Sequence, residues 1–302
     1  MKILYYLVIL PLSRLPFRVL YGLSDILYLA LYVLAGYRKK VVFSNLRKSF
    51  PAKNDDEIRE IAGKFYRHFC DLLIESIKLF SLTKEEAIHR CRVMNPEVID
   101  AFARSGQAVV LVTGHLNNWE LLGVAFRPQV VHQPIVFYRK LSNRFMDGVV
   151  KRSRERFGLK MLDKKKSGSV GTLGSEKIPT ALCMVADQSP SKNQKPYWMT
   201  FLGQETAVMF GTEKYAKKDG TPVFYAHLTK VKRGFYECYF ELITDDPQRV
   251  PYGYITQQHT KMLEADILKN PHVWLWTHKR WKRKRQESEE LYADVDLKDK
   301  SA

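Results

Sequence analysis

The chain has 302 residues, of which 45% are hydrophobic and 27% are charged. This composition supplies enough apolar material for one large core with appendages. For the chain as a whole it excludes intrinsic disorder, a collagen-like repeat and a polytopic membrane protein. The formal net charge of +17 predicts an anionic partner, which could be a nucleic acid, an anionic lipid surface or an acidic protein. The four cysteines have no metal-binding or redox spacing, so we expect reduced thiols at Cys70, Cys91, Cys183 and Cys238.

The N-terminal residues 1–37 are predicted to form a hydrophobic membrane anchor. Residues 3–12 and 19–37 are mostly apolar, and the second run is about as long as the ~20 residues that a bilayer span requires. The basic cluster at residues 38–40 favours the cytoplasmic side for the domain after it. The sequence does not separate a helix that spans the bilayer from one that lies in the interface. The alternative is a buried amphipathic helix of a soluble core.

Helices and short apolar strands alternate in residues 38–285. Apolar residues recur at helical spacing over residues 54–82, where Asn54 or Asp55 can act as the N-cap. Thr83 and Glu86 then form a capping-box pattern that predicts a second, short helix. Three glycines later in the chain predict a mobile loop at Gly168, Gly171 and Gly174.

Five short apolar runs are typical of buried strands, and they lie at residues 108–113, 130–137, 178–186, 222–228 and 236–243. Helical patterns lie at residues 144–157, 209–218 and 255–269. Strands that alternate with helices predict an α/β fold with a mixed, largely parallel central sheet flanked by helices.

The C-terminal part of the chain divides by charge. Residues 279–285 carry six positive charges, whereas residues 286–302 carry a net charge of −4. We therefore expect a folded domain that ends near residue 285 and an acidic, flexible tail over residues 286–302. Residues 1–278 keep a net charge of +15 (17 − 6 + 4), so the positive charge belongs to the body of the protein.

The strongest candidate for chemistry is the pair His115 and Glu120, at the junction of a predicted strand and an apolar helix. On one continuous helix these residues would lie about 140° apart, so they can meet only if the chain turns between them. If it turns, Glu120 can accept a hydrogen bond from one ring nitrogen, and the other nitrogen can act as a general base. The spacing alone favours an ordinary strand-end histidine and a first-turn carboxylate, because such pairs arise by chance in many proteins; the position at the end of a buried strand strengthens the functional interpretation without deciding it.

Residues 113–120 resemble the His-x4-Asp/Glu motif of glycerolipid-type acyltransferases, and within them the late acyltransferases of lipid A biosynthesis, the lauroyl/myristoyl group. Four further segments agree with this family in the same order: residues 45–51, residues 136–139 with Asn143 after them, residues 186–188 and residues 271–282. The chain departs from the family pattern at Lys140, where a proline is often found, and in its glycine-rich residues 164–177.

The resemblance implies a glycerolipid acyltransferase-like fold and the transfer of a fatty acyl chain to a hydroxyl of a lipid A precursor. The donor would be an acyl thioester of acyl carrier protein or of coenzyme A. His115 would be the general base, oriented by Glu120, and no metal or organic cofactor is implied. Substrate contacts are expected from Asn118, Arg139, Asn143, Asp187, Gln188 and Arg280.

The same resemblance implies a location at the cell inner membrane, with the catalytic domain on the cytoplasmic side. The expected partners are acyl carrier protein, the lipid acceptor and an anionic membrane surface, and no nucleic acid. One alternative is an acyltransferase for a lysophospholipid, an amino-acid lipid or another glycolipid. Another is a noncatalytic membrane or nucleic-acid-binding protein, which the net charge allows but no recognised binding motif supports.

Overall fold

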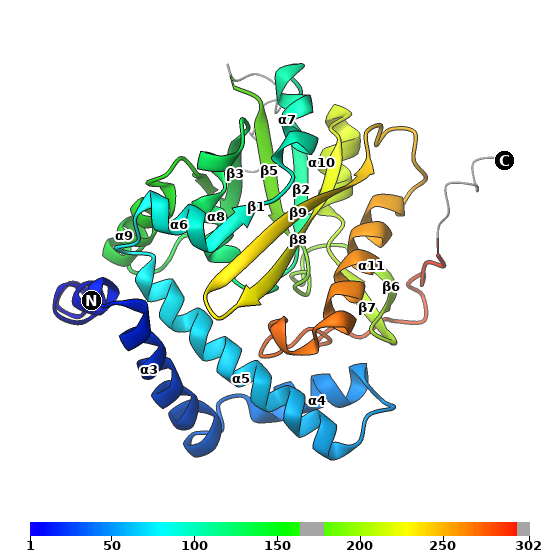
Figure 1. Cartoon of the computed structure of the whole chain (residues 1–302). Coiled ribbons are helices and arrows are strands. Elements are labelled where there is room, and N and C mark those ends of the chain that lie inside the picture. The colour runs from blue at the N-terminus through cyan, green and yellow to red at the C-terminus, as the bar shows by residue number, and fades with distance from the viewer. Residues whose placement is uncertain (164–177, 295–302) are drawn as a thin grey trace.

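The computed structural model describes residues 1–163 and 178–294. Within them, a sheet of seven strands in the order β1-β9-β8-β2-β5-β3-β4 forms the centre of the molecule (Figure 1). Neighbouring strands pair in parallel, except for the antiparallel pair β8 and β9. The strands are β1 (Cys91–Val93), β2 (Val109–Thr113), β3 (Gln133–Tyr138), β4 (Lys160–Asp163), β5 (Thr180–Val185), β8 (Val223–Lys232) and β9 (Phe235–Thr244). The predicted α/β fold with a mixed, largely parallel sheet is confirmed.

Helices cover both faces of the sheet, and each face has its own apolar core. One core contains residues from α4 (Lys39–Ser49), α5 (Asp55–Lys78), α10 (Gly211–Asp219) and α11 (Tyr254–Lys269). The other contains residues from α6 (Lys84–Arg90), α7 (Pro96–Arg104) and α8 (Trp119–Ala125). Helix α9 (Arg144–Glu155) follows β3 and leads into β4. The central strands are thus covered by helices on both faces, as the runs of apolar residues predict.

Two helix starts follow the capping patterns of the sequence. The Asn54 side chain accepts from the backbone N–H groups of Asp56 and Glu57, and the Glu57 side chain accepts from the Asn54 N–H. Thr83 and Glu86 form the same reciprocal pair at the start of α6. Each box satisfies backbone donors that the first helical turn leaves without partners.

A second, two-stranded sheet was not predicted from the sequence. It is the hairpin of β6 (Tyr197–Phe201) and β7 (Gln204–Val208). The turn residues Leu202 and Gly203 have φ values of 49° and 70°. Two positive φ values suit the right-handed twist of a hairpin, but leucine is seldom found there, so the sequence lacks the usual turn signal.

The N-terminal segment consists of short helical pieces: α1 (Lys2–Leu4), η1 (Tyr5–Ile9), α2 (Leu10–Arg14), α3 (Phe17–Tyr28) and η2 (Leu29–Leu34). Among the described residues, the stretch Phe17–Leu34 is the one helix long and apolar enough to cross a membrane, by length and composition. Only 11% of this stretch is buried in the structure.

Helix α3 lies beside α5 and contacts it through polar side chains (Figure 1). The Ser24 hydroxyl donates to Asp71 at 2.8 Å, and Arg233 pairs with both Asp25 and Asp71 at 2.7 Å. The side of the helical segment that carries Ile26, Leu29 and Val33 is exposed. The N-terminal segment therefore has a polar side against the body and an apolar side that the described chain leaves uncovered.

The beginning of the acidic tail packs against the body of the protein. The Tyr292 ring stacks on Tyr197 with 4.3 Å between ring centroids, and Lys261 pairs with Asp294 at 3.2 Å. The described part of the tail thus contacts the body as far as residue 294. The rest of the tail, residues 295–302, and the expected glycine loop in residues 164–177 lie outside the described residues.

Candidate active site

His115 and Asp187 meet at the carboxyl ends of two adjacent parallel strands. In the pairing of β2 with β5, Thr113 lies opposite Val185, and His115 and Asp187 each follow two residues later. The Nδ1 atom of His115 lies 2.6 Å from Oδ1 of Asp187, and the backbone N–H of His115 donates to Oδ2 at 2.8 Å. The two contacts fix both the ring and the backbone of His115 on one carboxylate.

Gly114 leaves room for two side chains that pack close to the backbone before His115. A Cβ atom on Gly114 would lie 2.6 Å from a methyl carbon of Leu263 and 3.4 Å from Oδ2 of Asp187. A side chain here would require the Leu263 side chain to shift. Gly114 therefore permits the close approach on which the His115–Asp187 contact depends.

Trp274 bonds directly to Asp187, and Asn45 holds the segment that carries Trp274. The indole N–H of Trp274 donates to Oδ2 of Asp187 at 2.7 Å. The Asn45 side chain donates to the carbonyl groups of Trp276 and His278, both at 2.9 Å, and so holds the same C-terminal segment. The segments at residues 45–51 and 271–282, singled out in the sequence, thus lie together and brace the carboxylate.

The surroundings of the pair favour a charged carboxylate and a basic imidazole. Burial lowers the pKa of His115, but the Asp187 charge and hydrogen bond outweigh it, and Glu120 adds to them, so the net pKa is raised. Burial raises the pKa of Asp187, yet the charge and hydrogen bonds of His115 and the Trp274 N–H bring it well below its usual range. Asp187 therefore stays ionised and stabilises the imidazolium form of His115.

The other ring nitrogen of His115 contacts Gln188. The Gln188 side-chain amide lies 3.2 Å from Nε2 of His115, and the Trp119 ring packs edge-on to the imidazole at 4.8 Å between centroids. The His115 side chain is 18% exposed. Because Asp187 accepts from Nδ1–H, Nε2 carries the lone pair, which suits a general base.

The expected contact of Glu120 with the His115 ring is not formed in the structure, where Nδ1 of His115 contacts Asp187. The Glu120 carboxylate pairs with Arg154 of α9 at 2.5 Å, and both side chains line a cavity of about 250 Å³. The reason is topological, because strand pairing places Asp187 at Nδ1 while the first turn of α8 directs Glu120 toward α9. Glu120 remains near enough for its charge to raise the pKa of His115.

Two of the expected substrate contacts are helix caps. Asn118 is buried at the start of α8, where its Oδ1 accepts from Leu121 N–H and its Nδ2 donates to Glu75, which is also buried. Asn143 accepts from the Met146 N–H at the start of α9. These contacts give Asn118 and Asn143 structural roles. Arg139 lies exposed, directly after β3.

Arg280 is buried near Asp187. Its Nη1 donates to the Ala207 carbonyl at 2.7 Å, and burial lowers its pKa to about 10 although Asp187 opposes the shift. Arg280, His259 and Asp187 line a cavity of about 10 Å³, which is near the room one water molecule needs. Arg280 is thus placed to balance the charge of Asp187, and with 2% exposure it offers no surface to a substrate.

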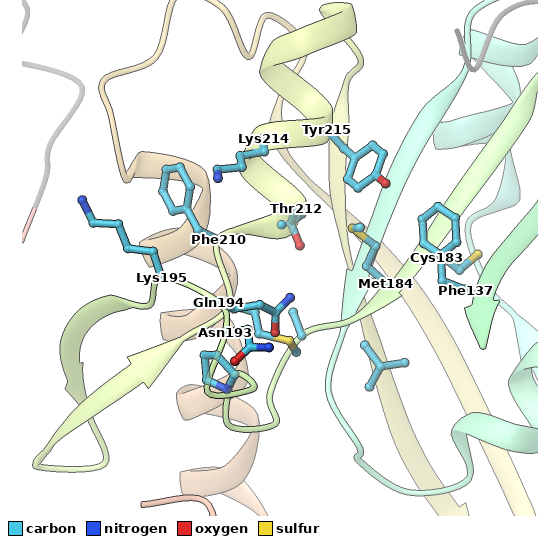
Figure 2. Close-up of a pocket in the computed structure, with 15 residues that line it drawn as sticks. Phe137, Cys183, Met184, Asn193, Gln194, Lys195, Phe210, Thr212, Lys214 and Tyr215 are labelled. Atoms are coloured by element: carbon cyan, nitrogen blue, oxygen red, sulfur yellow. The ribbon is translucent and has the colours of Figure 1, made fainter. Parts of the chain in front are cut away.

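A larger cavity opens beside Asp187. It has a volume of about 450 Å³ and lies between the end of β5, the loop at residues 190–195 and the start of α10 (Figure 2). Ala186, which directly precedes Asp187, is part of its wall. Among the described residues, no group of three or more histidine, cysteine, aspartate or glutamate side chains is arranged to hold a metal ion.

Two features of the site were missed in the sequence. The orienting role of Asp187 had a signal, because it follows its strand by the same two residues as His115, but the strand order is needed to use it. Arg154 had none, since it is one of several basic residues in a polar helix.

The chain is similar to known bacterial proteins. The family model described as bacterial lipid A biosynthesis acyltransferase matches residues 1–283. A lipid A biosynthesis palmitoleoyltransferase of Escherichia coli (strain K12) is 22% identical over 262 residues, which cover 84% of this chain and 82% of the relative. A lipid A biosynthesis acyltransferase of Shigella flexneri matches with the same identity and the same coverage.

Proposed function

Because the chain belongs to the family of bacterial lipid A biosynthesis acyltransferases, we propose that it moves a fatty acyl chain from acyl carrier protein to a hydroxyl of a lipid A precursor, with His115 as general base. The family establishes an acyltransferase of lipid A biosynthesis that acts on a lipid A precursor. The single observation that carries the proposed chemistry is the contact of 2.6 Å between His115 and Asp187.

In the proposed reaction, Nε2 of His115 takes the proton from the acceptor hydroxyl. The oxygen attacks the thioester carbonyl, and the tetrahedral intermediate collapses to the ester as the C–S bond breaks. The imidazolium returns its proton to the leaving thiolate, so that no proton is gained or lost overall. Asp187 holds the reactive tautomer of His115 and stabilises the imidazolium while it carries the proton.

Gln188 is the proposed donor to the developing oxyanion. Its amide lies 3.2 Å from Nε2 of His115, so its N–H groups are close to the atoms that react. A donor in this position stabilises negative charge that appears only as the thioester carbonyl is attacked. One such donor is worth on the order of 10²–10³ in turnover.

We assign the cavity that contains Glu120 and Arg154 to the lipid acceptor. Its apolar wall includes Ile9 of the N-terminal segment and Phe80, so it adjoins the uncovered apolar side of the molecule. Arg154 pairs with Glu120 in the resting protein and provides a positive charge for an anionic group of the acceptor. Glu120 then acts on His115 through its charge rather than through a hydrogen bond.

We further propose that the protein acts at the cytoplasmic face of the inner membrane. The support is the exposed apolar side of the N-terminal segment, together with a net charge of +17 that favours anionic lipids and an acidic carrier protein. The hydrogen bonds of Tyr21 and Ser24 with α5 would hold this anchor against the folded body.

The test is a transfer assay with purified protein in lipid vesicles, an acyl thioester of acyl carrier protein and a lipid A precursor. The wild type should add one acyl chain to the precursor, and His115→Ala should lower turnover by about 10²–10⁴-fold. Unchanged thermal unfolding shows that the variant is folded. Acylation of a lysophospholipid in place of the precursor, or near-normal turnover of His115→Ala, would contradict the proposal.

A further inference from the structure

We propose that the cavity of about 450 Å³ beside Asp187 receives the phosphopantetheine arm of the acyl donor, and that Lys214 and Lys195 bind the phosphate of this arm. This inference rests on the proposed function, since it presumes an acyl thioester as donor. The His115–Asp187 pair accounts for the proton transfer in this reaction, and the cavity would account for binding of the donor.

The cavity lies next to the strand end that carries Asp187. Its wall includes the last residues of β5 and Ala186, which directly precedes Asp187. A smaller apolar cavity of about 80 Å³ shares Cys183, Met184 and Val185 with it, and is also lined by Trp119, whose ring contacts His115. Both cavities therefore adjoin the carboxyl end of β5, the strand that leads to Asp187.

The wall of the cavity is held in place before any ligand binds. The Gln194 side chain accepts from the backbone N–H and the hydroxyl of Ser191, and the Gln194 N–H donates to the Ser191 carbonyl. Arg283 then donates to the carbonyl groups of Ser191 and Gln194. The loop that forms one side of the cavity is thus held by hydrogen bonds within it and by hydrogen bonds from Arg283 of the basic C-terminal segment.

The two lysines provide positive charge for a phosphate. Lys195 and Lys214 line the cavity and are exposed. In the described part of the chain, neither forms an ion pair, in contrast to Lys217 one turn away, which donates to the Val250 carbonyl. Figure 2 shows both lysines on the side of Phe210, across the cavity from Met184 and Phe137.

The chemistry of the lining matches the parts of a phosphopantetheine arm. The arm has a phosphate at one end, two amides, a branched apolar segment and the thioester at the other end. The lysines suit the phosphate, the amide side chain of Asn193 suits the amides, and Met184 and Phe137 suit the apolar segment. A volume of about 450 Å³ lies within the range of ligand pockets.

The position of the cavity favours the donor over the lipid acceptor as the source of the phosphate. The apolar side chains that we assign to the membrane lie on α3 and η2, whereas α10 lies at the opposite end of the molecule (Figure 1). A lipid acceptor held in a membrane approaches the former, and a water-soluble carrier approaches the latter. The two substrates then reach His115 from different sides.

The experiment compares two small donors that differ only in the phosphate, acyl-phosphopantetheine and acyl-pantetheine, at saturating lipid acceptor. For the wild type we expect kcat/KM to be at least about tenfold higher with the phosphorylated donor, since a charge-assisted contact is worth more than one factor of ten. Lys214→Gln should reduce this preference through KM, so that the two donors are used with similar efficiency. Lys195→Gln should act in the same direction.

Lys218→Gln is the matched control, because Lys218 lies on the same helix and is outside the cavity. It should keep the wild-type preference. Equal use of the two donors by the wild type, or an equal loss with both donors in Lys214→Gln, would overturn the inference while leaving the proposed function intact. A wild type that transfers from neither donor nor from acyl carrier protein would overturn both.

A second arm of the experiment separates the two sources of phosphate. The Lys214→Gln defect is measured with lipid acceptors that carry or lack their phosphate groups, with acyl-phosphopantetheine as donor. We expect the defect to be the same with both acceptors. A defect that depends on the acceptor phosphate would assign the lysines to the lipid and overturn the donor assignment.

Discussion

Two carboxylates influence His115, and they differ in what they contact. Asp187 is buried, accepts three hydrogen bonds and holds Nδ1 of the imidazole. Glu120 is paired with Arg154 and acts on His115 only through its charge. Near-neighbour spacing in the sequence pointed to Glu120, whereas the residue that touches the ring is 72 positions away.

The pH dependence of transfer should report the raised pKa of His115. A general base has to be neutral, so kcat/KM should rise with pH and level off above the pKa of His115, which lies above the ordinary value of about 6.5. In Asp187→Asn, the acidic limb should move to lower pH, because the burial that lowers the pKa of His115 remains and the carboxylate that raises it is gone. Initial rates with acyl carrier protein between about pH 5 and pH 9 measure this. A limb that stays in place in the variant would show that another group titrates.

At the level of elements, the active site follows from one strand pairing. Parallel β2 and β5 are in register at Thr113 and Val185, so equal two-residue extensions bring His115 and Asp187 together. The sequence predicts both strands. It does not predict that β5 lies next to β2, since β3 and β4 intervene along the chain. The sequence therefore singles out His115 as a candidate, but the carboxylate that contacts its ring becomes evident only from the strand order.

Elements with weak local signals were the ones missed. Strands β1 and β4 have three and four residues, and the β6–β7 hairpin turns at Leu202. Short strands are stabilised by their neighbours in the sheet rather than by their own composition. The capped helices α5 and α6, in contrast, carry their start signals in adjacent residues, and those starts were predicted correctly.

A second histidine links β8, β9 and α11 away from the active site. Nδ1 of His227 lies 3.0 Å from both oxygens of Asp266, and Nε2 lies 3.0 Å from Glu241. Burial lowers the pKa of His227, but the two carboxylates outweigh it and raise the net value. The proton on His227 therefore binds more tightly in the folded state than in the unfolded chain.

The stabilising effect of His227 should depend on pH. Because the folded-state pKa of His227 is raised, protonated His227 stabilises the fold fully at pH values below its unfolded pKa of about 6.5. This stabilisation is lost as the pH rises through the folded-state pKa. His227→Gln should therefore lower the unfolding temperature more at about pH 6 than at about pH 9, with a free-energy difference below about 1 kcal/mol because the pairs are partly exposed. Thermal unfolding in detergent at both pH values measures the effect. A larger loss at the higher pH would contradict it.

For the whole molecule, the uncovered apolar side of the N-terminal segment should be the membrane contact. Replacing three of its exposed residues by glutamine, in Ile26→Gln, Leu29→Gln and Val33→Gln combined, should lower binding to anionic vesicles by at least about tenfold while folding is kept. Vesicle co-sedimentation measures the binding.

Exposed apolar residues elsewhere on the protein provide the control for this membrane test. The matched variant combines Met94→Gln, Val131→Gln and Leu268→Gln, and it should bind vesicles as the wild type does. Equal binding by the two triple variants would show that the membrane contact lies elsewhere.

The central claim is that Asp187, and not Glu120, is the carboxylate that orients the catalytic base. The most direct test is the single-turnover rate of acyl transfer by Asp187→Asn and by Glu120→Gln, at saturating donor and acceptor and about pH 8. We predict a loss of about 10²–10⁴-fold for Asp187→Asn, which removes the charge that holds the reactive tautomer, and a loss of no more than about tenfold for Glu120→Gln. A greater loss in Glu120→Gln than in Asp187→Asn would contradict the account.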